Sequence, residues 1–365
     1  RSILAQSERE GVYLSSDRRR IQKLGLAMLS VSIGLAGLLA YGYTPYRLHE
    51  RGIGTVAFLN VGQGDAALIR TPEGKHVLID GGGNLSFHQT EEDWKIRQDS
   101  FETGKDVVVP LLKQRGVHRL DVVVMTHLDA DHIGGLQAVL DEIPVGAILF
   151  NGTVKSDPAV TWLFQTALDL GIPLFAPVRG DILRLGPTTS LTILAPDDVS
   201  DQPPILEEDK QNDWSIVCLL EMNGRRFLFA GDVEERGERS IVEALAMEGG
   251  NGAFAEGRVV TKGQVANSGA ADGIAERRID VMKVAHHGSK TSTAPEWLGF
   301  WQPVAAVISV GKNNPYRHPH ETVVDRLHQY GAQVFRTDLN GEIQFRAAPG
   351  QLEYRVLTAR TIGPS

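Results

Sequence analysis

Thr126-His127-Leu128-Asp129-Ala130-Asp131-His132-Ile133-Gly134-Gly135 is the stretch that decides the fold class. It follows an apolar run, Val122 to Met125, which is typical of a short buried strand. Its HxDxDH pattern puts two imidazoles and two carboxylates in one turn between strand and helix, and the glycine pair lets the backbone pass close by. An incidental polar loop is the alternative, but nitrogen and oxygen ligands this dense favour a zinc or manganese site.

The composition is that of a globular protein without the bulk charge of a nucleic-acid-binding protein. Its 365 residues suffice for one large domain or two ordinary ones, and 42% of them are hydrophobic. There are 37 basic and 45 acidic side chains, so an anionic substrate would have to be held by metal and a local basic rim. The single cysteine, Cys218, lies in an apolar run and is expected in the core.

The N-terminal part predicts a membrane anchor. A basic cluster at residues 18–23 precedes 20 uncharged residues, Leu24 to Tyr43, and 20 helical residues span about 30 Å, the thickness of a bilayer core. Tyrosines at the far end suit an aromatic belt. By the positive-inside rule, residues 1–23 are expected in the cytoplasm and everything after residue 45 outside the cell membrane. A buried helix or a signal peptide is the alternative, and the initial arginine suggests a fragment of a longer chain.

A layered α/β hydrolase domain is expected over residues 52–350, because strand-like and helix-like patterns alternate there. Residues 84–105 are expected to form a loop or short helix over the site, and residues 248–276, rich in glycine and alanine, a flexible insertion. The main predicted strands are Thr55 to Asn60, Ala66 to Arg70, His76 to Asp80, Arg119 to Thr126, Ala147 to Phe150, Leu191 to Ala195, Ser215 to Met222, Arg226 to Ala230, Val281 to Ala285 and Ala305 to Val310. The main predicted helices are Val107 to Arg115, Gln137 to Glu142, Ala159 to Leu170, Glu234 to Met247 and Glu321 to Tyr330.

Four groups of polar residues follow predicted strands: Asp80, the motif at residues 127–132, Asp232, and His286-His287. Ligand sites gather at the carboxyl ends of strands in layered α/β folds. None of the 11 histidines lies between His132 and His286. A further metal ligand in that gap must therefore be Asp232 or another oxygen donor.

These residues resemble the metallo-β-lactamase superfamily, and more closely the C-terminal domain of the ComEC family, the membrane channel for DNA uptake in natural competence. The resemblance covers roughly residues 52–345. It implies an αββα sandwich preceded by one transmembrane helix, a metal-dependent hydrolase site, DNA and other competence proteins as partners, and degradation of the strand that is not imported. The motifs that carry it are Asn60-Val61-Gly62-Gln63-Gly64-Asp65, Leu78-Ile79-Asp80-Gly81-Gly82, Asn212 with Ser215, Phe229-Ala230-Gly231-Asp232, His286-His287-Gly288-Ser289, Ser309-Val310-Gly311, and Asn314-Pro315-Tyr316-Arg317-His318-Pro319.

The chain departs from the commonest superfamily pattern at the metal site. Asp129 stands where that pattern has the middle histidine of HxHxDH, and the separate mid-chain histidine ligand is missing near Asn212 to Ser215. Both departures recur in the ComEC pattern. They weaken the case for two full zinc sites and make manganese plausible.

The ligand roles follow as hypotheses. His127 and Asp129 hold one metal ion, Asp131 and His132 hold a second, and Asp232 bridges them. His286 or His287 completes a shell; the sequence does not decide which, and His286 is favoured.

Further roles concern the chemistry and the substrate. Asp80 orients a ligand histidine, and a water between the metals, activated near neutral pH, attacks phosphorus. Asp131 and His318 are the candidate catalytic residues, His318 holding a phosphate oxygen or protonating the leaving group, unless it is only a surface residue beside His320. Asp65 belongs either to the site or to a turn. Candidate contacts to the phosphate backbone are Ser289, Lys290 and Lys312, although Lys290 is as compatible with a solvated lysine.

Three functions compete. The first is a membrane-tethered phosphodiesterase or nuclease that acts on DNA, single strand or incoming duplex, together with the rest of a polytopic channel. The second is a hydrolase of another substrate on the same scaffold, such as a β-lactamase, thioesterase or choline-phosphate esterase; the acidic balance favours it slightly, and Asp129 opposes a lactamase-like zinc site. The third is a DNA-guiding domain whose metal is structural, which the intact bridging aspartate and both central histidines oppose.

Overall fold

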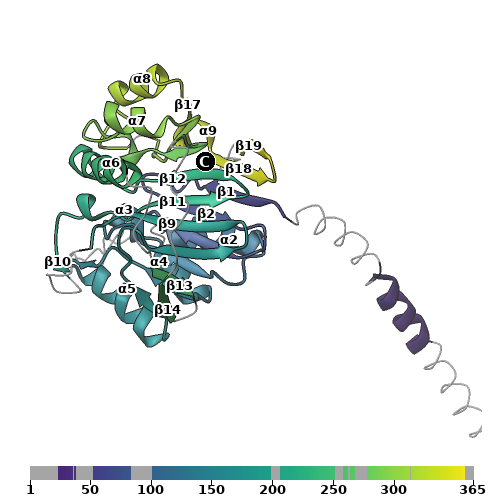
Figure 1. Cartoon of the computed structure of the whole chain (residues 1–365). Coiled ribbons are helices and arrows are strands. Elements are labelled where there is room, and N and C mark those ends of the chain that lie inside the picture. The colour runs from purple at the N-terminus through teal and green to yellow at the C-terminus, as the bar shows by residue number, and fades with distance from the viewer. Residues whose placement is uncertain are drawn as a thin grey trace, which may run out of the picture. The chain divides into compact units, whose positions relative to one another are not determined.

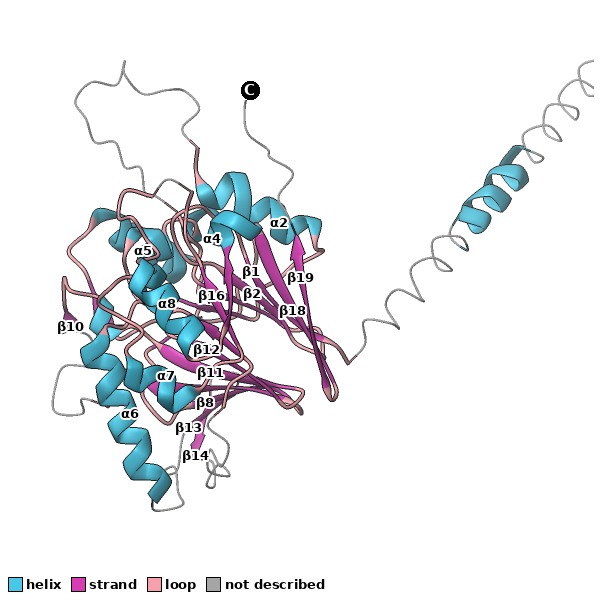
Figure 2. Ribbon diagram, turned by 90° about the horizontal axis from the view of Figure 1, so that it is seen from above, coloured by secondary structure: helices cyan, strands magenta, loops and turns pink. Residues whose placement is uncertain are grey.

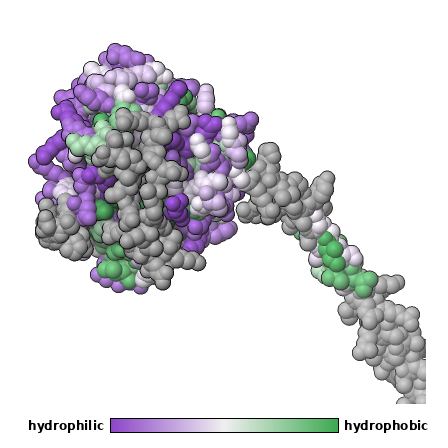
Figure 3. All heavy atoms as spheres, in the orientation of Figure 1, coloured by the Kyte–Doolittle hydropathy of each residue, from purple (hydrophilic) through white to green (hydrophobic). Residues whose placement is uncertain are grey.

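The computed structural model describes residues 24–35, 37, 52–83, 101–198, 206–250, 258–261, 264–267, 278–312 and 314–357. The chain divides into two compact units, residues 1–51 and residues 52–365. In the first unit, residues 24–35 are helical, and the large apolar side chains along them are exposed (Figure 3). Within the described residues, no helix has both the length and the apolar character needed to cross a bilayer. The whole of the predicted segment 1–23 and part of the predicted span 24–43 lie outside the described residues.

The second unit is built on two mixed β-sheets that pack face to face (Figures 1 and 2). The first sheet has the order β19 (Gln351–Leu357), β18 (Glu342–Ala348), β1 (Gly54–Phe58), β2 (Ala67–Arg70), β3 (His76–Ile79), β4 (Val122–Val124), β5 (Ile148–Leu149), β7 (Leu174–Phe175). The second has the order β14 (Gln264–Asn267), β13 (Arg258–Thr261), β8 (Ile182–Gly186), β9 (Thr189–Ala195), β11 (Val217–Met222), β12 (Arg225–Phe229), β15 (Val281–Lys283), β16 (Ala305–Ile308), β17 (Gln333–Arg336). A separate small sheet pairs β6 (Thr153–Val154) with β10 (Leu206–Glu207).

Helices cover the outer face of each sheet, and this gives four layers (Figure 1). The first sheet is covered by α2 (Val109–Gln114), α4 (Leu136–Glu142) and α5 (Pro158–Asp169). The second is covered by α6 (Glu235–Gly250), α7 (Pro295–Trp301) and α8 (Glu321–Gln329). The shorter helical pieces are η2 (Gly104–Val108), α3 (Ala130–Ile133), η3 (Asn212–Trp214), η4 (Ala285–Gly288) and α9 (Thr337–Asn340). The predicted αββα arrangement is confirmed.

Alternation along the strands explains the layering. In β1, Val56 and Phe58 point into the core between the sheets, whereas Ala57 points to the core under the helices. Successive side chains of a strand face opposite sides, so a strand segment buried on both faces is apolar, as β1 is from Val56 to Phe58. Cys218 lies in the core between the sheets, as expected.

The predicted elements differ from the structure mainly at their ends and in short strands. The strand expected over Arg119 to Thr126 is regular only from Val122 to Val124, and β7, β8, β17 and α7 have no counterpart among the expected elements. Within the expected insertion at residues 248–276, β13 and β14 form a hairpin, and β13 pairs with β8. Its first residues, 248–250, end α6. The remaining residues of that segment, and residues 84–100, lie outside the described ones, so mobility there stays a prediction.

Parallel strands carry the polar motifs to one edge. β3 runs parallel to β4, and β12 runs parallel to β15. Asp80 follows β3, the HxDxDH motif follows β4, Asp232 follows β12, and the histidine pair follows β15. Because parallel strands end at the same edge of a sheet, residues distant in sequence converge there.

Candidate metal centre

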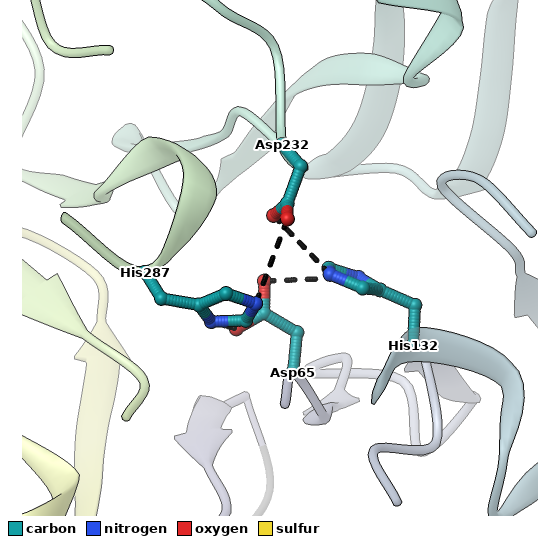
Figure 4. Close-up of side chains that lie close together, drawn as sticks. All are labelled: Asp65, His132, Asp232 and His287. Atoms are coloured by element: carbon teal, nitrogen blue, oxygen red, sulfur yellow. Dashed lines mark ion pairs between the residues drawn. The ribbon is translucent and has the colours of Figure 1, made fainter. Parts of the chain in front are cut away.

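Four buried side chains form a compact cluster at this edge (Figure 4). Asp65, His132, Asp232 and His287 each offer one nitrogen or oxygen atom, and these atoms all lie within 4.8 Å of one another. Figure 4 shows the side chains of His132, Asp232 and His287 pointing toward one another from three separate segments. Histidine nitrogen and carboxylate oxygen at such spacing are ligands of a divalent transition metal.

His132 is oriented by Asp80. The Nδ1 atom of His132 lies 2.9 Å from Oδ2 of Asp80, and the same carboxylate accepts hydrogen bonds from the backbone N–H and the hydroxyl of Thr126 at 2.8 and 2.7 Å. With these donors around it, Asp80 acts as an acceptor, so Nδ1 of His132 carries the proton. The Nε2 atom is then directed at Oδ1 of Asp232, 3.2 Å away.

His287 is oriented in the same way by the backbone. Its Nδ1 atom lies 2.9 Å from the carbonyl oxygen of Ser309, which only accepts hydrogen bonds. Its Nε2 atom lies 3.1 Å from Oδ2 of Asp131 and 3.5 Å from Oδ2 of Asp232. Asp131, His132, Asp232 and His287 thus define what we name the inner position.

His286 is the histidine favoured from the sequence, but the structure places His287 in the cluster instead. His286 is 22% exposed, its Nε2 atom is 3.9 Å from Oδ2 of Asp232, and its Nδ1 atom is 3.4 Å from Oε1 of Glu234. The two residues sit in the turn η4 with φ angles of 47° and 51°, a left-handed backbone that L residues rarely adopt. The turn directs His287 inward and His286 toward the rim, a choice that sequence spacing does not reveal.

His127 and Asp129 also lie close to Asp232. The Nε2 atom of His127 lies 3.8 Å from Oδ2 of Asp129 and 4.0 Å from Oδ2 of Asp232. We name His127, Asp129 and Asp232 the outer position. The other carboxylate oxygen of Asp129 accepts a hydrogen bond from Nζ of Lys155 at 2.7 Å. One oxygen of Asp129 therefore faces His127, and the other is hydrogen-bonded to Lys155.

The charges within the cluster are strongly coupled. Burial and the neighbouring His132 lower the pKa of His127 to about 3, so this imidazole is neutral and offers a lone pair. Burial opposes charge on His132 and on Asp232, but their mutual attraction prevails: it raises the pKa of His132 and lowers that of Asp232. Burial likewise opposes charge on Asp131, yet the nearby imidazoles of His287 and His132 lower the pKa of Asp131.

Several buried atoms of the cluster have no hydrogen-bond partner among the described residues. They are Nε2 of His127, His132 and His287, and Oδ1 of Asp65 and Asp232. Leaving a buried polar atom unpaired costs about 1–3 kcal/mol of folding free energy, so a cluster of such atoms indicates a bound ligand or a functional site. Divalent cations bound among these nitrogen and oxygen atoms would give them partners, and the residues present therefore fit a metal centre.

Asp65 belongs to the site and not only to a turn. It is buried, its backbone N–H donates to the carbonyl of Asp131, and its carboxylate forms an ion pair with Lys283. Lys283 is itself buried at the end of β15 and had no role in the sequence interpretation. The available signal was a lysine inside an otherwise apolar strand.

His318 lies at the rim of the centre, half-buried. Its ring centroid is 5.6 Å from that of His286 and 6.5 Å from that of His287. Burial and the charges of these two histidines lower the pKa of His318 to about 4, so it is neutral at pH 7.

The three candidate phosphate contacts lie in different surroundings. Ser289 is buried, and its hydroxyl pairs with that of Thr291 at 3.1 Å. Lys290 is exposed and lines an open hollow of about 710 Å³ with Arg236 and Arg239. Lys312 is exposed on the loop that carries His318. Among the three, the two lysines are accessible to a substrate.

Comparison with known proteins agrees with this geometry. The model of the metallo-beta-lactamase superfamily matches residues 59–312. ComE operon protein 3 of Bacillus subtilis (strain 168) is 31% identical over 329 residues, 89% of this chain and 37% of that protein. Competence protein ComA of Neisseria gonorrhoeae is 29% identical over 330 residues, 89% of this chain and 38% of that protein. Recombination protein 2 of Haemophilus influenzae is 26% identical over 336 residues, 92% of this chain and 34% of that protein.

The chain spans little more than a third of the length of these curated relatives. The similarity covers most of the chain and includes the whole of the described cluster. It confirms the resemblance to ComEC-type competence proteins inferred from the motifs. With the family model matching well over half of its residues, the chain belongs to the metallo-beta-lactamase superfamily.

Proposed function

We propose that this protein is a metal-dependent phosphodiesterase, a nuclease of a ComEC-type DNA-uptake channel that degrades the strand not imported during natural transformation. The observation that carries the proposal is the convergence of two oriented imidazoles, His132 and His287, on the shared carboxylate Asp232 (Figure 4). A set of inward, unpaired ligand atoms in a buried cluster is suited to hold a reactive metal.

The inner and outer positions together would hold up to two ions, manganese or zinc, with Asp232 between them. When bound, a divalent metal supplies Lewis acidity and a water nucleophile at neutral pH. The chain's own residues set the geometry: Asp80 and Ser309 fix the two imidazoles, and His318 faces the centre from the rim. Because His318 is neutral at pH 7, a hydrogen bond to a phosphate oxygen is its favoured role over protonation of the leaving group.

The loop beside His318 supports a single-stranded nucleic acid as substrate. Tyr316 is 64% exposed, and its ring stacks on His318 with centroids 5.8 Å apart and planes 25° apart. Asn314 pins the loop, since its amide donates to the carbonyls of Gly311 and His318 at 3.0 and 2.7 Å. An exposed aromatic ring on a loop held by such hydrogen bonds is suited to stack against a base, and the exposed Lys312 nearby suits the phosphate backbone.

Membrane attachment is part of the proposal. We infer that residues 24–43 cross the cell membrane, with residues 1–23 in the cytoplasm and the hydrolase domain outside. Support comes from the exposed apolar side chains of residues 24–35 and the basic cluster before them. The partners would be DNA, the remaining part of a polytopic channel and other competence proteins, as the names of the relatives suggest. A reporter fused after residue 365 tests this topology, and activity confined to the cytoplasm contradicts it.

The decisive experiment is hydrolysis by the metal-stripped, purified chain after addition of manganese, zinc or magnesium, with a labelled single-stranded oligonucleotide as substrate. We expect cleavage with at least one metal and none by Asp131→Ala or His132→Ala, both of which should stay folded. Cleavage of a β-lactam, thioester or choline-phosphate ester but not of DNA supports another hydrolase on this scaffold. Metal and DNA binding without hydrolysis supports the DNA-guiding domain.

A further inference from the structure

The positively charged side chain of Lys155 lies beside the outer position. Asp129 extends one carboxylate oxygen toward His127, at 3.8 Å, and the other toward Nζ of Lys155, at 2.7 Å. The two side chains of the ion pair are 34% and 27% exposed, so solvent and ions reach them. A metal ion that binds Asp129 enters the field of the lysine's positive charge.

Lys155 is held in this place by the fold. It directly follows β6, and the hydroxyl of Thr153 in β6 donates to Oε1 of the buried Gln211 at 2.9 Å. The same Gln211 oxygen accepts the side-chain N–H of Asn151 at 3.0 Å and the backbone N–H of Leu128 at 3.4 Å. One buried amide thus ties the strand before Lys155 to the residue before Asp129. The ion pair is consequently a product of the scaffold rather than of a chance side-chain conformation.

The inner and outer positions differ in what they offer a cation. The inner position has two imidazoles and the carboxylates of Asp131 and Asp232. The outer position has one imidazole, His127, and it shares Asp232 with the inner one. The charge of its remaining carboxylate, Asp129, is balanced by Lys155. No histidine between His132 and His286 is available to add a ligand.

We propose that Lys155 is a built-in competitor for the metal at Asp129, so that the centre binds one ion tightly at the inner position and a second one weakly at the outer position. The second ion binds only where it outcompetes the ammonium group for Asp129. Coulomb repulsion between Lys155 and the incoming ion adds to this cost, since both sit within a few ångströms of the same carboxylate. Lys155 is therefore the residue that sets the number of metal ions. The inference rests on the proposed metal site but not on its hydrolytic activity.

The test compares the metal-stripped full chain with Lys155→Met, which keeps most of the length of the side chain and removes its charge. Manganese is titrated by calorimetry, and the bound metal is counted after equilibrium dialysis. We expect about one tight ion per wild-type chain, and in Lys155→Met a second ion that binds at least tenfold more tightly than in the wild type. At two equivalents of manganese, the electron paramagnetic resonance spectrum of the variant should show a spin-coupled pair, whereas wild type should show isolated ions.

Three further variants keep the result interpretable. Lys155→Arg retains the charge and should bind metal as wild type does. Lys113→Met breaks an ion pair with Glu142 between α2 and α4, and it should leave metal binding unchanged. Lys155→Gln replaces the methionine variant if circular dichroism shows that the latter is unfolded. Equal affinity for the second ion in wild type and Lys155→Met, or two tight ions in wild type, overturns the inference. Absence of any metal binding overturns the metal centre itself, and tight metal binding without hydrolysis leaves the inference standing while the proposed function fails.

Discussion

Asp80 accepts a hydrogen bond from Nδ1 of His132 at 2.9 Å, and this buried contact decides which nitrogen of the imidazole faces the centre. Asp80 follows β3 and His132 lies in α3, so two segments of the first sheet's edge build the arrangement. Thr126 holds the same carboxylate by its backbone and its hydroxyl. A ligand histidine whose second nitrogen is fixed in this way loses little freedom when it binds metal.

Replacement of Asp80 by asparagine should lower metal affinity about 10–100-fold without removing a ligand. The amide presents N–H groups where Asp80 now accepts hydrogen bonds, so it no longer holds Nδ1 of His132. Thr126→Ser keeps the hydroxyl that supports Asp80 and is the matched control. Metal affinity is measured by calorimetric titration of the stripped protein. Unchanged affinity in Asp80→Asn would show that His132 does not bind metal through the opposite nitrogen.

The adjacent histidines should respond very differently to mutation. His287→Ala removes an inner-position imidazole whose Nε2 atom is unpaired, and we expect a loss of more than about 100-fold in metal affinity, beyond a typical loss for residues behind the ligands. His286→Ala removes a rim side chain paired with Glu234 and should cost less than about tenfold. The metal content of each variant after dialysis distinguishes these two outcomes. A larger loss of metal in His286→Ala than in His287→Ala would indicate that His286 is the ligand.

Lys283 and Asp65 should be coupled in stability. Both are buried, so Lys283→Met leaves a carboxylate without its partner, which typically costs about 3–5 kcal/mol. The double variant Lys283→Met with Asp65→Asn has no unpaired charge and should recover part of that loss. Urea unfolding of the metal-free protein, followed by tryptophan fluorescence, measures both. A cost below about 1 kcal/mol for the single variant would mean that the pair is not buried in solution.

Glu238 should give folding stability a pH dependence of its own. This buried carboxylate on α6 accepts hydrogen bonds from the backbone N–H groups of Thr293 and Ala294, which directly precede α7. Burial raises its pKa from 4.5 to about 7 and outweighs these hydrogen bonds. Because the folded pKa exceeds the unfolded one, its contribution to stability is fully present below pH 4.5 and is lost as the pH rises through 7.

The measurement for Glu238 is the difference in unfolding free energy between wild type and Glu238→Gln. Between pH 5 and pH 8, wild type should lose on the order of 2–3 kcal/mol relative to this variant. Glu243→Gln, on the exposed side of the same helix, should run parallel to wild type. A constant difference across this range would mean that Glu238 titrates alike in the folded and unfolded states.

The fold was predictable because its signals are local. Asp80 directly follows β3, and the HxDxDH motif and Asp232 follow β4 and β12 closely, so a strand pattern and the polar residues after it sufficed. Short strands such as β7 carry too few residues for a periodic pattern. They form because neighbouring strands supply their hydrogen-bond partners, and no local sequence records that.

The parts of the site that were missed depend on tertiary contacts. Lys155 meets Asp129, and Lys283 meets Asp65, only after separate segments have packed together. His286 and His287 are chemically identical neighbours, and the left-handed turn alone decides which one points inward. Residue type and spacing do not reveal which side chains meet, because these contacts depend on backbone angles and on partners far along the chain.

The identity of the productive metal follows from the unequal positions. The inner position offers two imidazoles and two carboxylates, which zinc and manganese both accept. The outer position offers mainly oxygen, from Asp129 and Asp232, and oxygen-rich six-coordinate sites suit manganese or magnesium better than tetrahedral zinc. Zinc generally binds more tightly than manganese along the first-row series, so it should occupy the inner position readily.

Manganese should therefore support faster hydrolysis than zinc, although zinc binds more tightly. Tight binding at the inner position does not by itself complete a centre that needs an ion beside Asp129. The measurement is cleavage of a labelled single-stranded oligonucleotide by the stripped protein with one metal added at a time, and then with zinc added to the manganese form. We expect zinc to inhibit the manganese form by displacing ions, and Lys155→Met to reach full activity at lower manganese concentration than wild type. Full activity with zinc alone and none with manganese would show that Asp129 does not set the metal preference.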